Sequence, residues 1–272
     1  MENDSYAIHQ VSGRIGYITV IEYKTKILLI DTGSKKDYRF LEHFILHELK
    51  RKMTDIKLVV VSHVHPDHSG GTHALKKKHG RIVAGHPDLD RWYSGFGGRM
   101  QQVADVVFAH ITAMKTGAPV RRFWFKRKVR PDYFLKDGEP LPFFEEWMAF
   151  YTPGHTTHDI SFYHEKSKTL YAGDMIVYIN SSYHLPYGLA LPDSMEASLK
   201  KVSSLKVDTL ILPHGGIKKI DDIQETIRPL FSELHGHMGF PIAILKPLTL
   251  LSPEIKRERA SGKESPPLPK AR

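Results

Sequence analysis

The chain of 272 residues contains no cysteine. This absence excludes disulfides, thiolate metal ligands and a cysteine nucleophile, so any metal would be held by nitrogen and oxygen atoms. The sequence also lacks a run of about 18 apolar residues, the length that a membrane-spanning helix needs. Its first residues, MENDSYAIHQ, are polar and acidic and do not show the basic and then apolar pattern of a signal peptide. We therefore expect a soluble cytoplasmic protein that does not associate with a membrane.

The net charge of +9 is concentrated in two segments. Residues 121–130 hold six basic residues and no acidic residue, and residues 251–272 hold six basic and three acidic residues. Charge is balanced elsewhere, which argues against a chain that coats nucleic acid with its whole surface. Residues 251–272 also combine several prolines with charges, so we expect this basic tail to be flexible.

The apolar patterns predict an α/β fold. Residues 14–31 are typical of paired strands, residues 37–50 show helical spacing, and residues 56–61 form a short apolar strand of the kind buried on both faces. Further helices are expected at 69–79, 194–205 and 221–235, and further strands at 81–85, 147–152, 159–164, 168–172 and 208–212. Strands that first pair and later alternate with helices favour two sheets packed face to face, with helices outside.

A mostly helical insertion at about residues 86–132 interrupts this alternation. We therefore predict one domain at residues 1–240 that contains the insertion as a cap, followed by the flexible tail at 251–272. Several apolar side chains of the insertion are available either to line a pocket or to form the core of the cap itself: Trp92, Tyr93, Phe96, Met100, Phe108 and Met114.

The segment VVVSHVHPDHSGG, residues 59–71, places four potential metal ligands directly after a buried strand. His63 and His65 are two residues apart in an extended chain, so both imidazoles point to the same side. A proline then bends the chain, and Asp67 and His68 leave in another direction, toward a second ion. Burying such mutually repelling side chains without a cation is costly, so the segment predicts metal binding rather than an ordinary polar loop.

This His-x-His-x-Asp-His run after a strand resembles the hallmark of the metallo-β-lactamase superfamily. Later family positions have counterparts in the same order, which are His155 in TPGHT, Asp174 in YAGD and His214 in LPHGG. The resemblance covers about residues 14–215. It implies a four-layer αββα sandwich with the metals at one edge, between the two sheets.

The resemblance also implies which residues bind metal. His63, His65 and His155 would hold the first ion, Asp67, His68 and His214 the second, and Asp174 would bridge them. These nitrogen and oxygen ligands suit two divalent ions, for which we expect zinc, although the same set would accept iron or manganese.

Asp31 matches the acidic residue of the family's DTG turn. We expect its carboxylate to orient a ligand without touching metal, although aspartate is also common in ordinary turns. Two positions depart from family patterns, since the last ligand lies in Leu-Pro-His-Gly where many members have Pro-Gly-His-Gly, and Val177 stands where lactonases carry tyrosine. The remaining histidines near these motifs are expected at the surface or behind the ligands, with His184 also placed to face substrate: His158, His184, His235 and His237.

Two metal ions about 3.5–4 Å apart lower the pKa of a shared water, so a metal-bridged hydroxide becomes available as a nucleophile at neutral pH. Asp67 would act as the catalytic residue that orients this nucleophile and moves a proton. By its likeness to the glyoxalase II and lactonase groups, the chain is expected to be a dinuclear zinc hydrolase that cleaves a thioester, a carboxylic ester or a lactone.

Three alternatives stay open. The same dinuclear site would serve a phosphodiesterase or nuclease. An oxygenase of the persulfide dioxygenase kind would use one iron on His63, His155 and Asp174. A non-catalytic binding protein on the same scaffold would have no chemical need for all seven ligands.

The basic segment RRFWFKRKVR at 121–130 bears on the partner, which we expect to be a small molecule. Its cationic surface suits an anionic acyl thioester, but an ordinary solvated loop would look the same. A third interpretation is single-stranded nucleic acid binding, with Phe123, Trp124 and Phe125 as stacking platforms, which we do not favour. The sequence predicts no oligomeric state.

Overall fold

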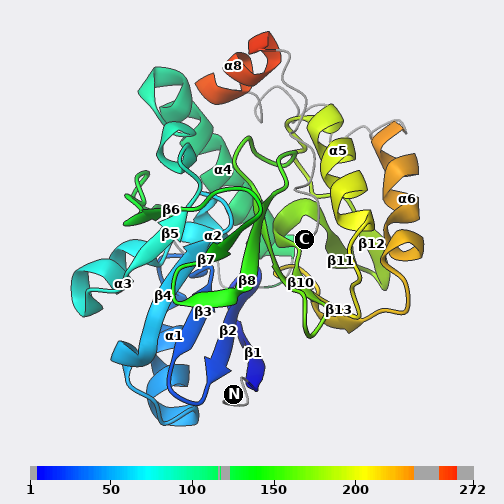
Figure 1. Ribbon diagram of the computed structural model, residues 1–272. Helices are drawn as coiled ribbons and strands as arrows, with labels where there is room; N and C mark the ends of the chain where they lie inside the picture. Colours follow the sequence, from blue (N-terminus) through cyan, green and yellow to red (C-terminus); the bar gives the residue numbers. More distant parts are fainter. Residues whose placement is uncertain (1–4, 116, 118–122, 236–250, 262–272) are drawn as a thin grey trace.

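The computed structural model describes residues 5–115, 117, 123–235 and 251–261 (Figure 1). It contains two six-stranded sheets and one two-stranded ribbon. The first sheet has the strands in chain order: β1 (Tyr6–Ser12), β2 (Tyr17–Tyr23), β3 (Ile27–Ile30), β4 (Ile56–Val61), β5 (Val83–Gly85) and β6 (Tyr133–Phe134). The second has the order β14 (Gly216–Lys219), β13 (Thr209–Leu212), β10 (Thr169–Tyr171), β9 (Ile160–His164), β8 (Phe144–Tyr151) and β7 (Glu139–Leu141). The ribbon pairs β11 (Val177–Ile179) with β12 (Ser182–His184).

The longer helices lie on the outer sides of these sheets (Figure 1). Beside the first sheet are α1 (Tyr38–His43), which continues as a π-helical turn at Phe44–Glu48, α2 (Pro66–Ser69), α3 (Thr72–His79) and α4 (Gly95–Lys115). Beside the second are α5 (Pro192–Ser203) and α6 (Ile223–His235), while α8 (Pro253–Ser261) packs on α4. Short 3-10 turns occupy Met53–Asp55, Leu89–Arg91 and Gly173–Met175. Among the described residues, no helix has the length and apolarity that crossing a bilayer requires.

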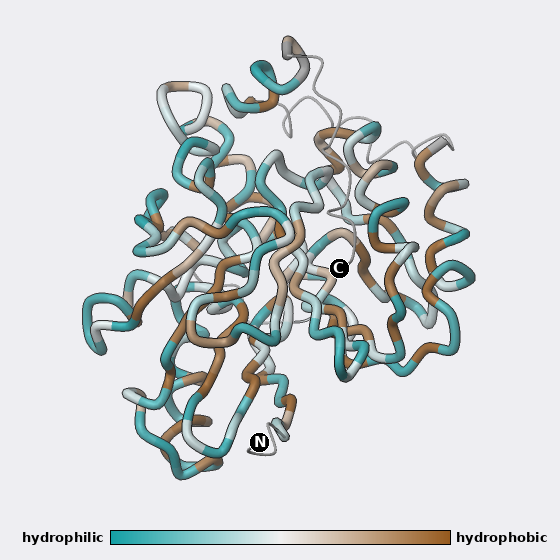
Figure 2. The backbone as a smooth tube through the Cα atoms, viewed as in Figure 1, coloured by the Kyte–Doolittle hydropathy of each residue, from teal (hydrophilic) through white to brown (hydrophobic). Residues whose placement is uncertain are grey.

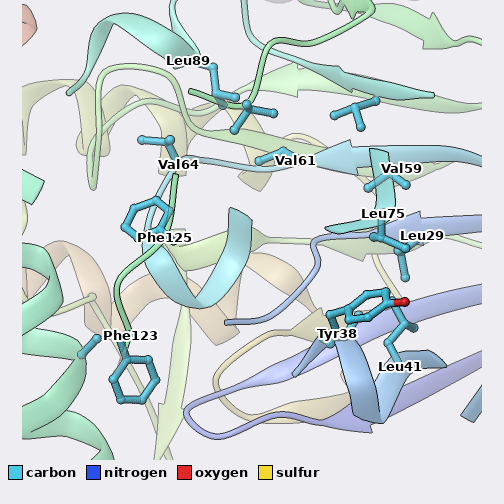
Figure 3. Packing of buried hydrophobic residues seen from close by; sticks show 14 of the residues in the cluster. Leu29, Tyr38, Leu41, Val59, Val61, Val64, Leu75, Leu89, Phe123 and Phe125 are labelled. Carbon is cyan, nitrogen blue, oxygen red and sulfur yellow. The ribbon is translucent and has the colours of Figure 1, made fainter. Parts of the chain in front are cut away.

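Three apolar clusters separate four layers of structure. In the first sheet, Leu29 and Val59 pack outward with Tyr38 and other residues from the flanking helices (Figure 3). Between the sheets, Leu28 and other buried residues of the first sheet pack against residues of the second sheet such as Trp147 and Phe162. A third cluster lies between the second sheet and the helices α5 and α6. The hydropathy of the residues along the chain agrees with this arrangement, because hydrophobic residues are concentrated in the strands and recur along the helices (Figure 2). The fold is therefore the predicted αββα sandwich.

Strand β3 shows why the sequence folds this way. All its residues, Ile27–Ile30, are fully buried, because alternate side chains point into two different clusters. A strand covered on both faces needs a continuous apolar run, and β4 has the same character. These two buried strands pair in parallel, so both end at the same edge of the first sheet.

Strand directions in the second sheet bring three further loops to that edge. Strand β9 is antiparallel to both β8 and β10, and β10 is parallel to β13, so β8, β10 and β13 run the same way. Their carboxyl ends lead into His155, Asp174 and His214. The backbone of Ile160 donates a hydrogen bond of 3.0 Å to the carbonyl of Ser62, which ties this edge to the end of β4.

Several elements were not among those expected from the sequence, including β1, the short strands β6, β7 and β14 and the ribbon of β11 and β12. Strand β1 was not predicted, because its apolar residues are interrupted by His9 and Gln10, yet it pairs with β2 along its whole length from Tyr6↔Tyr23 to Ser12↔Tyr17. The tail was expected to be flexible from Leu251 onward, but residues 251–261 are ordered against α4, with Ile255 buried. The contacts of this part are the buried side chain of Ile255 and the backbone N–H groups of Leu251 and Ser252, which donate to Gln101. Residues 262–272 lie outside the described residues.

Trp147 on β8 gives a direct test of the core between the sheets. Its side chain is fully buried, and its indole nitrogen donates a hydrogen bond of 2.9 Å to the hydroxyl of Tyr23. We expect Trp147→Ala to lower the free energy of unfolding by about 3–5 kcal/mol, because a large cavity forms and a polar partner is left behind. Urea unfolding followed by circular dichroism measures this. Trp124→Ala is the matched control, since Trp124 is 52% exposed, and it should change stability by less than about 0.5 kcal/mol. Equal losses in both variants would contradict the assigned core.

Candidate metal centre

The structure brings all seven predicted ligand side chains together at the edge between the sheets. Four of them follow β4 within one short segment, and the others follow β8, β10 and β13: His63, His65, Asp67, His68, His155, Asp174 and His214. Their ligand atoms form three overlapping groups, each with all atoms within 4.8 Å of one another. We call His63, His65 and His155 the first group, and Asp67, His68 and His214 the second group. The remaining group, which consists of His63, His68 and Asp174, joins these two. The arrangement needs both sheets, because neither contributes all of the side chains.

The first group consists of three imidazoles. Nε2 of His63 lies 3.1 Å from Nδ1 of His65, and Nε2 of His155 lies 2.9 Å from the same Nδ1 atom. His65 therefore turns Nδ1 toward the other two rings. All three nitrogen atoms face one common point.

The second group consists of Asp67, His68 and His214. The Nε2 atoms of the two histidines are 3.3 Å apart, and Asp67 Oδ2 lies 3.4 Å from Nε2 of His214. Asp174 lies between the groups, with Oδ2 at 3.5 Å from Nε2 of His155 and Oδ1 at 3.2 Å from Nε2 of His68. Its carboxylate can therefore reach both groups.

The donor geometry fits a divalent metal. Two ligand atoms at about 2.0–2.1 Å from one tetrahedral ion lie roughly 3.3 Å from each other. The nitrogen pairs at 2.9–3.3 Å match this spacing. In addition, Oδ1 of Asp174 is buried without a hydrogen-bond partner in the described structure. A buried carboxylate oxygen that faces imidazole nitrogens is the arrangement expected of a metal ligand.

Burial keeps the first group neutral. It lowers the pKa of His65 to about 4 and that of His155 to about 3, and it lowers the pKa of His63 well below its usual value. These imidazoles therefore present free lone pairs at neutral pH, which is the form that binds metal.

The second group has the opposite electrostatics. Burial opposes the charged form of His214, but Asp174 and Asp67 outweigh it and raise its pKa to about 10. The pKa of His68 is raised in the same way. For the Asp174 carboxyl, burial favours the neutral form, yet the facing histidines hold its pKa well below its usual range. The carboxylates therefore stabilise positive charge beside them. Without metal, the protons on His68 and His214 supply this charge, and a bound cation would replace those protons.

Asp31 contacts His68 on the side of the imidazole ring that faces away from Asp174. Its Oδ2 atom lies 2.8 Å from Nδ1 of His68 and accepts hydrogen bonds from the hydroxyls of Ser62 at 2.6 Å and Tyr171 at 2.5 Å. Its Oδ1 atom accepts from the backbone N–H of Ser62 at 2.8 Å. The residue has a φ of 60°, which aspartate tolerates better than most residues. Nδ1 of His68 is thereby engaged, and Nε2 points at Asp174 and His214.

Asp105 on α4 is a further residue at the centre, and the sequence analysis did not single it out. Its Oδ2 atom lies 3.4 Å from Nε2 of His65 and accepts a hydrogen bond of 2.7 Å from the hydroxyl of Tyr93. Burial raises the pKa of its carboxyl to about 6. The sequence feature that could have marked Asp105 is its isolation, since it is the only acidic residue between Asp90 and Asp132.

The aromatic residues of the insertion divide into two groups. Trp92 and Tyr93 are buried and donate to Asp105, so they support the centre instead of lining an apolar pocket. Phe96, Met100 and Met114 are exposed. Phe108 is half-buried.

The basic segment 121–130 does not offer the stacking surface that the nucleic-acid interpretation required. Phe123 and Phe125 are buried in the outer cluster of the first sheet, so neither is available to stack on a base. Only Trp124 of the three aromatics is exposed. Arg121 and Arg122 lie outside the described residues.

Among the other histidines, His158 is buried, and its Nε2 accepts a hydrogen bond of 3.2 Å from the backbone N–H of Val64, the residue between His63 and His65. His184 is half-buried, with Nδ1 at 3.8 Å from Glu233. The side chain of His235 and all of His237 lie outside the described residues.

An αββα sandwich with a histidine and aspartate cluster at the edge between its sheets defines a metallo-hydrolase architecture. The model of the metallo-beta-lactamase superfamily matches residues 11–214, so the chain belongs to that superfamily. The family is one of metal-dependent hydrolases, and the cluster is able to bind divalent metal.

Individual relatives agree with this assignment. The chain is 22% identical over 227 residues to the probable metallo-hydrolase YflN of Bacillus subtilis (strain 168), covering 76% of this chain and 83% of the relative. It is 26% identical over 236 residues to the probable metallo-hydrolase YqjP of the same organism, covering 79% and 72%. Among solved structures, the metallo-beta-lactamase family protein TTHA1429 from Thermus thermophilus has a TM-score of 0.64 at 18% identity and 96% coverage of both chains. The superfamily protein ST1585 from Sulfolobus tokodaii has a TM-score of 0.61 at 16% identity, covering 94% of this chain and 99% of that one. These structural likenesses show the fold.

Proposed function

We propose that the protein is a dinuclear zinc hydrolase that cleaves a thioester, a carboxylic ester or a lactone. The observation that carries the proposal is the pair of adjoining ligand groups with Asp174 between them. One group of three imidazoles and one of two imidazoles and a carboxylate are donor sets that zinc accepts. Two bound zinc ions would supply a hydroxide nucleophile at neutral pH and polarise the carbonyl group of the substrate.

The exposure of the ligands indicates the side from which substrate approaches. The side chains of His65, Asp67 and His214 are 14%, 15% and 17% exposed, whereas those of His63 and His68 are 1% and 2% exposed. The first three therefore border the solvent, and the latter two form the buried floor. Substrate would enter over His65, Asp67 and His214.

Asp67 is the residue we propose to act as a general base. Without metal, the pKa of its carboxyl is about 2, because the positive charges of His68 and His214 outweigh the effect of burial. It is therefore ionised at neutral pH and accepts hydrogen bonds. From the solvent-facing edge of the second group, Asp67 would orient the attacking water and accept its proton. His63, His65 and His155 would hold their rings fixed on the opposite side.

The experiment that tests this function combines metal loading with substrate choice. The full chain is loaded with zinc and assayed on a glutathione thioester, an aryl ester, a lactone and bis(p-nitrophenyl) phosphate, before and after chelation. We expect hydrolysis of at least one carbonyl substrate, its loss on chelation and its return with zinc. Cleavage of the phosphodiester alone would replace the proposal with a phosphodiesterase. An iron-loaded chain that hydrolyses none of these and consumes oxygen with a persulfide would replace it with an oxygenase.

A further inference from the structure

The described C-terminal segment, residues 251–261, reaches the metal centre through a chain of polar contacts. The backbone N–H groups of Leu251 and Ser252 donate to Oε1 of Gln101 at 2.9 and 3.2 Å. Nε2 of Gln101 donates to Oδ1 of Asp105 at 2.8 Å, and Oδ2 of Asp105 lies 3.4 Å from Nε2 of His65. The segment is thus separated from the ligand His65 by only two side chains.

The direction of each link is fixed by its chemistry. Backbone N–H groups only donate and an ionised carboxylate only accepts, so the amide of Gln101 must turn its oxygen to the segment and its nitrogen to Asp105. Gln101 and Asp105 are both buried, and Ser252 is fully buried. An unpaired polar group at any of these positions would be costly, so the links depend on one another.

Other contacts hold the segment and Asp105 in the same arrangement. The hydroxyl of Ser252 donates to the carbonyl of Trp92 at 2.7 Å, and the indole of Trp92 lies 3.4 Å from Oδ2 of Asp105. A Cβ atom at Gly97 would lie 2.6 Å from the carbonyl oxygen of Leu251. The backbone of the segment therefore approaches α4 closely because position 97 is glycine.

We propose that Asp105 is a positioning residue that orients His65 for metal binding, and that the C-terminal segment, docked on Gln101, holds Asp105 in place. Nδ1 of His65 faces His63 and His155, while Nε2 faces Asp105, so the carboxylate fixes which nitrogen is offered to the metal. The segment thereby contributes to the metal site from the far end of the described chain. This inference rests on the proposed metal site.

The test measures metal affinity in the full-length protein. Metal-free protein is titrated with Zn²⁺ against a chromophoric chelator, and with Co²⁺ while its visible absorption bands are recorded. We expect Asp105→Asn to lower the affinity of the site that contains His65 by about 10–100-fold and to change the Co²⁺ spectrum. Gly97→Ala, which leaves Gln101 and Asp105 intact, should lower the same affinity by about threefold or more, because it displaces Leu251.

Arg99→Ala is the control, since Arg99 is exposed on the same helix and should leave both readouts unchanged. The melting temperature of each metal-free variant separates a loss of folding from a loss of positioning. Unchanged affinity and spectrum in Asp105→Asn would overturn the role of Asp105. A normal affinity in Gly97→Ala, with Leu251 displaced as judged by faster amide exchange, would overturn the role of the segment. Failure of the unmodified protein to bind Zn²⁺ at all would instead refute the proposed function.

Discussion

Asp174→Ala is expected to reduce the bound metal from two ions to one or fewer per chain and to lower kcat/KM by roughly 10³-fold. The carboxylate lies within 3.5 Å of imidazole nitrogens from both ligand groups, so its removal weakens both at once. A metal ion supplies several kcal/mol of charge stabilisation, and each 1.4 kcal/mol corresponds to a tenfold change in rate. Plasma mass spectrometry after dialysis measures the metal, and the carbonyl substrate that the unmodified enzyme hydrolyses measures the rate.

Asp193→Ala is the matched control for this change. Asp193 is an exposed residue in the first turn of α5 and belongs to none of the ligand groups, so its loss removes an aspartate and no candidate ligand. It should keep two metal ions and full activity. An Asp174→Ala protein that retained two ions and stayed within tenfold of the unmodified rate would contradict the bridging role of Asp174.

Asp31→Asn is expected to have the second largest effect. Asparagine keeps the size of the side chain and tolerates the φ of 60°, but its amide nitrogen cannot accept a hydrogen bond. Ser62, His68 and Tyr171 all direct groups at this carboxylate, so at least one of them loses its partner. We expect a loss of about 1–3 kcal/mol in the free energy of unfolding for each unpaired donor. Metal affinity at the group containing His68 should fall by about 10–100-fold.

Chelator competition and urea unfolding check these two effects separately. Asp208→Asn serves as the control, because the Asp208 side chain is exposed and pairs with Lys168 at the surface, where a salt bridge contributes about 0–1 kcal/mol. If Asp31→Asn lost stability but bound metal as tightly as the unmodified chain, Asp31 would be a structural residue without influence on His68.

The sequence predicts the parts of this protein that are determined locally. The strand β4 and the run from His63 to His68 are contiguous, so the buried strand and the candidate ligands that follow it could be recognised in one short segment. The candidate ligands His155, Asp174 and His214 each follow a strand, and their order along the chain resembles that of a known family. The structure then shows why they meet, since β8, β10 and β13 run in the same direction.

The parts that could not be predicted depend on contacts distant in sequence. Tyr171 donates to Asp31 across 140 positions, and Leu251 contacts Gln101 across 150 positions. No local pattern marks such pairs. Asp105 lies in an amphipathic helix, where its proximity to His65 follows only from how α4 packs on the first sheet. Strand β1 interrupts its apolar residues with His9 and Gln10, and its pairing with β2 shows only in the fold.

Anomalous X-ray scattering at the zinc absorption edge, from crystals of the zinc-loaded full chain, tests the central claim most directly. The account predicts two peaks of similar height, one bounded by His63, His65 and His155 and the other by Asp67, His68 and His214, with Asp174 in contact with both. A single peak in either group, or zinc bound elsewhere with these side chains empty, would contradict it.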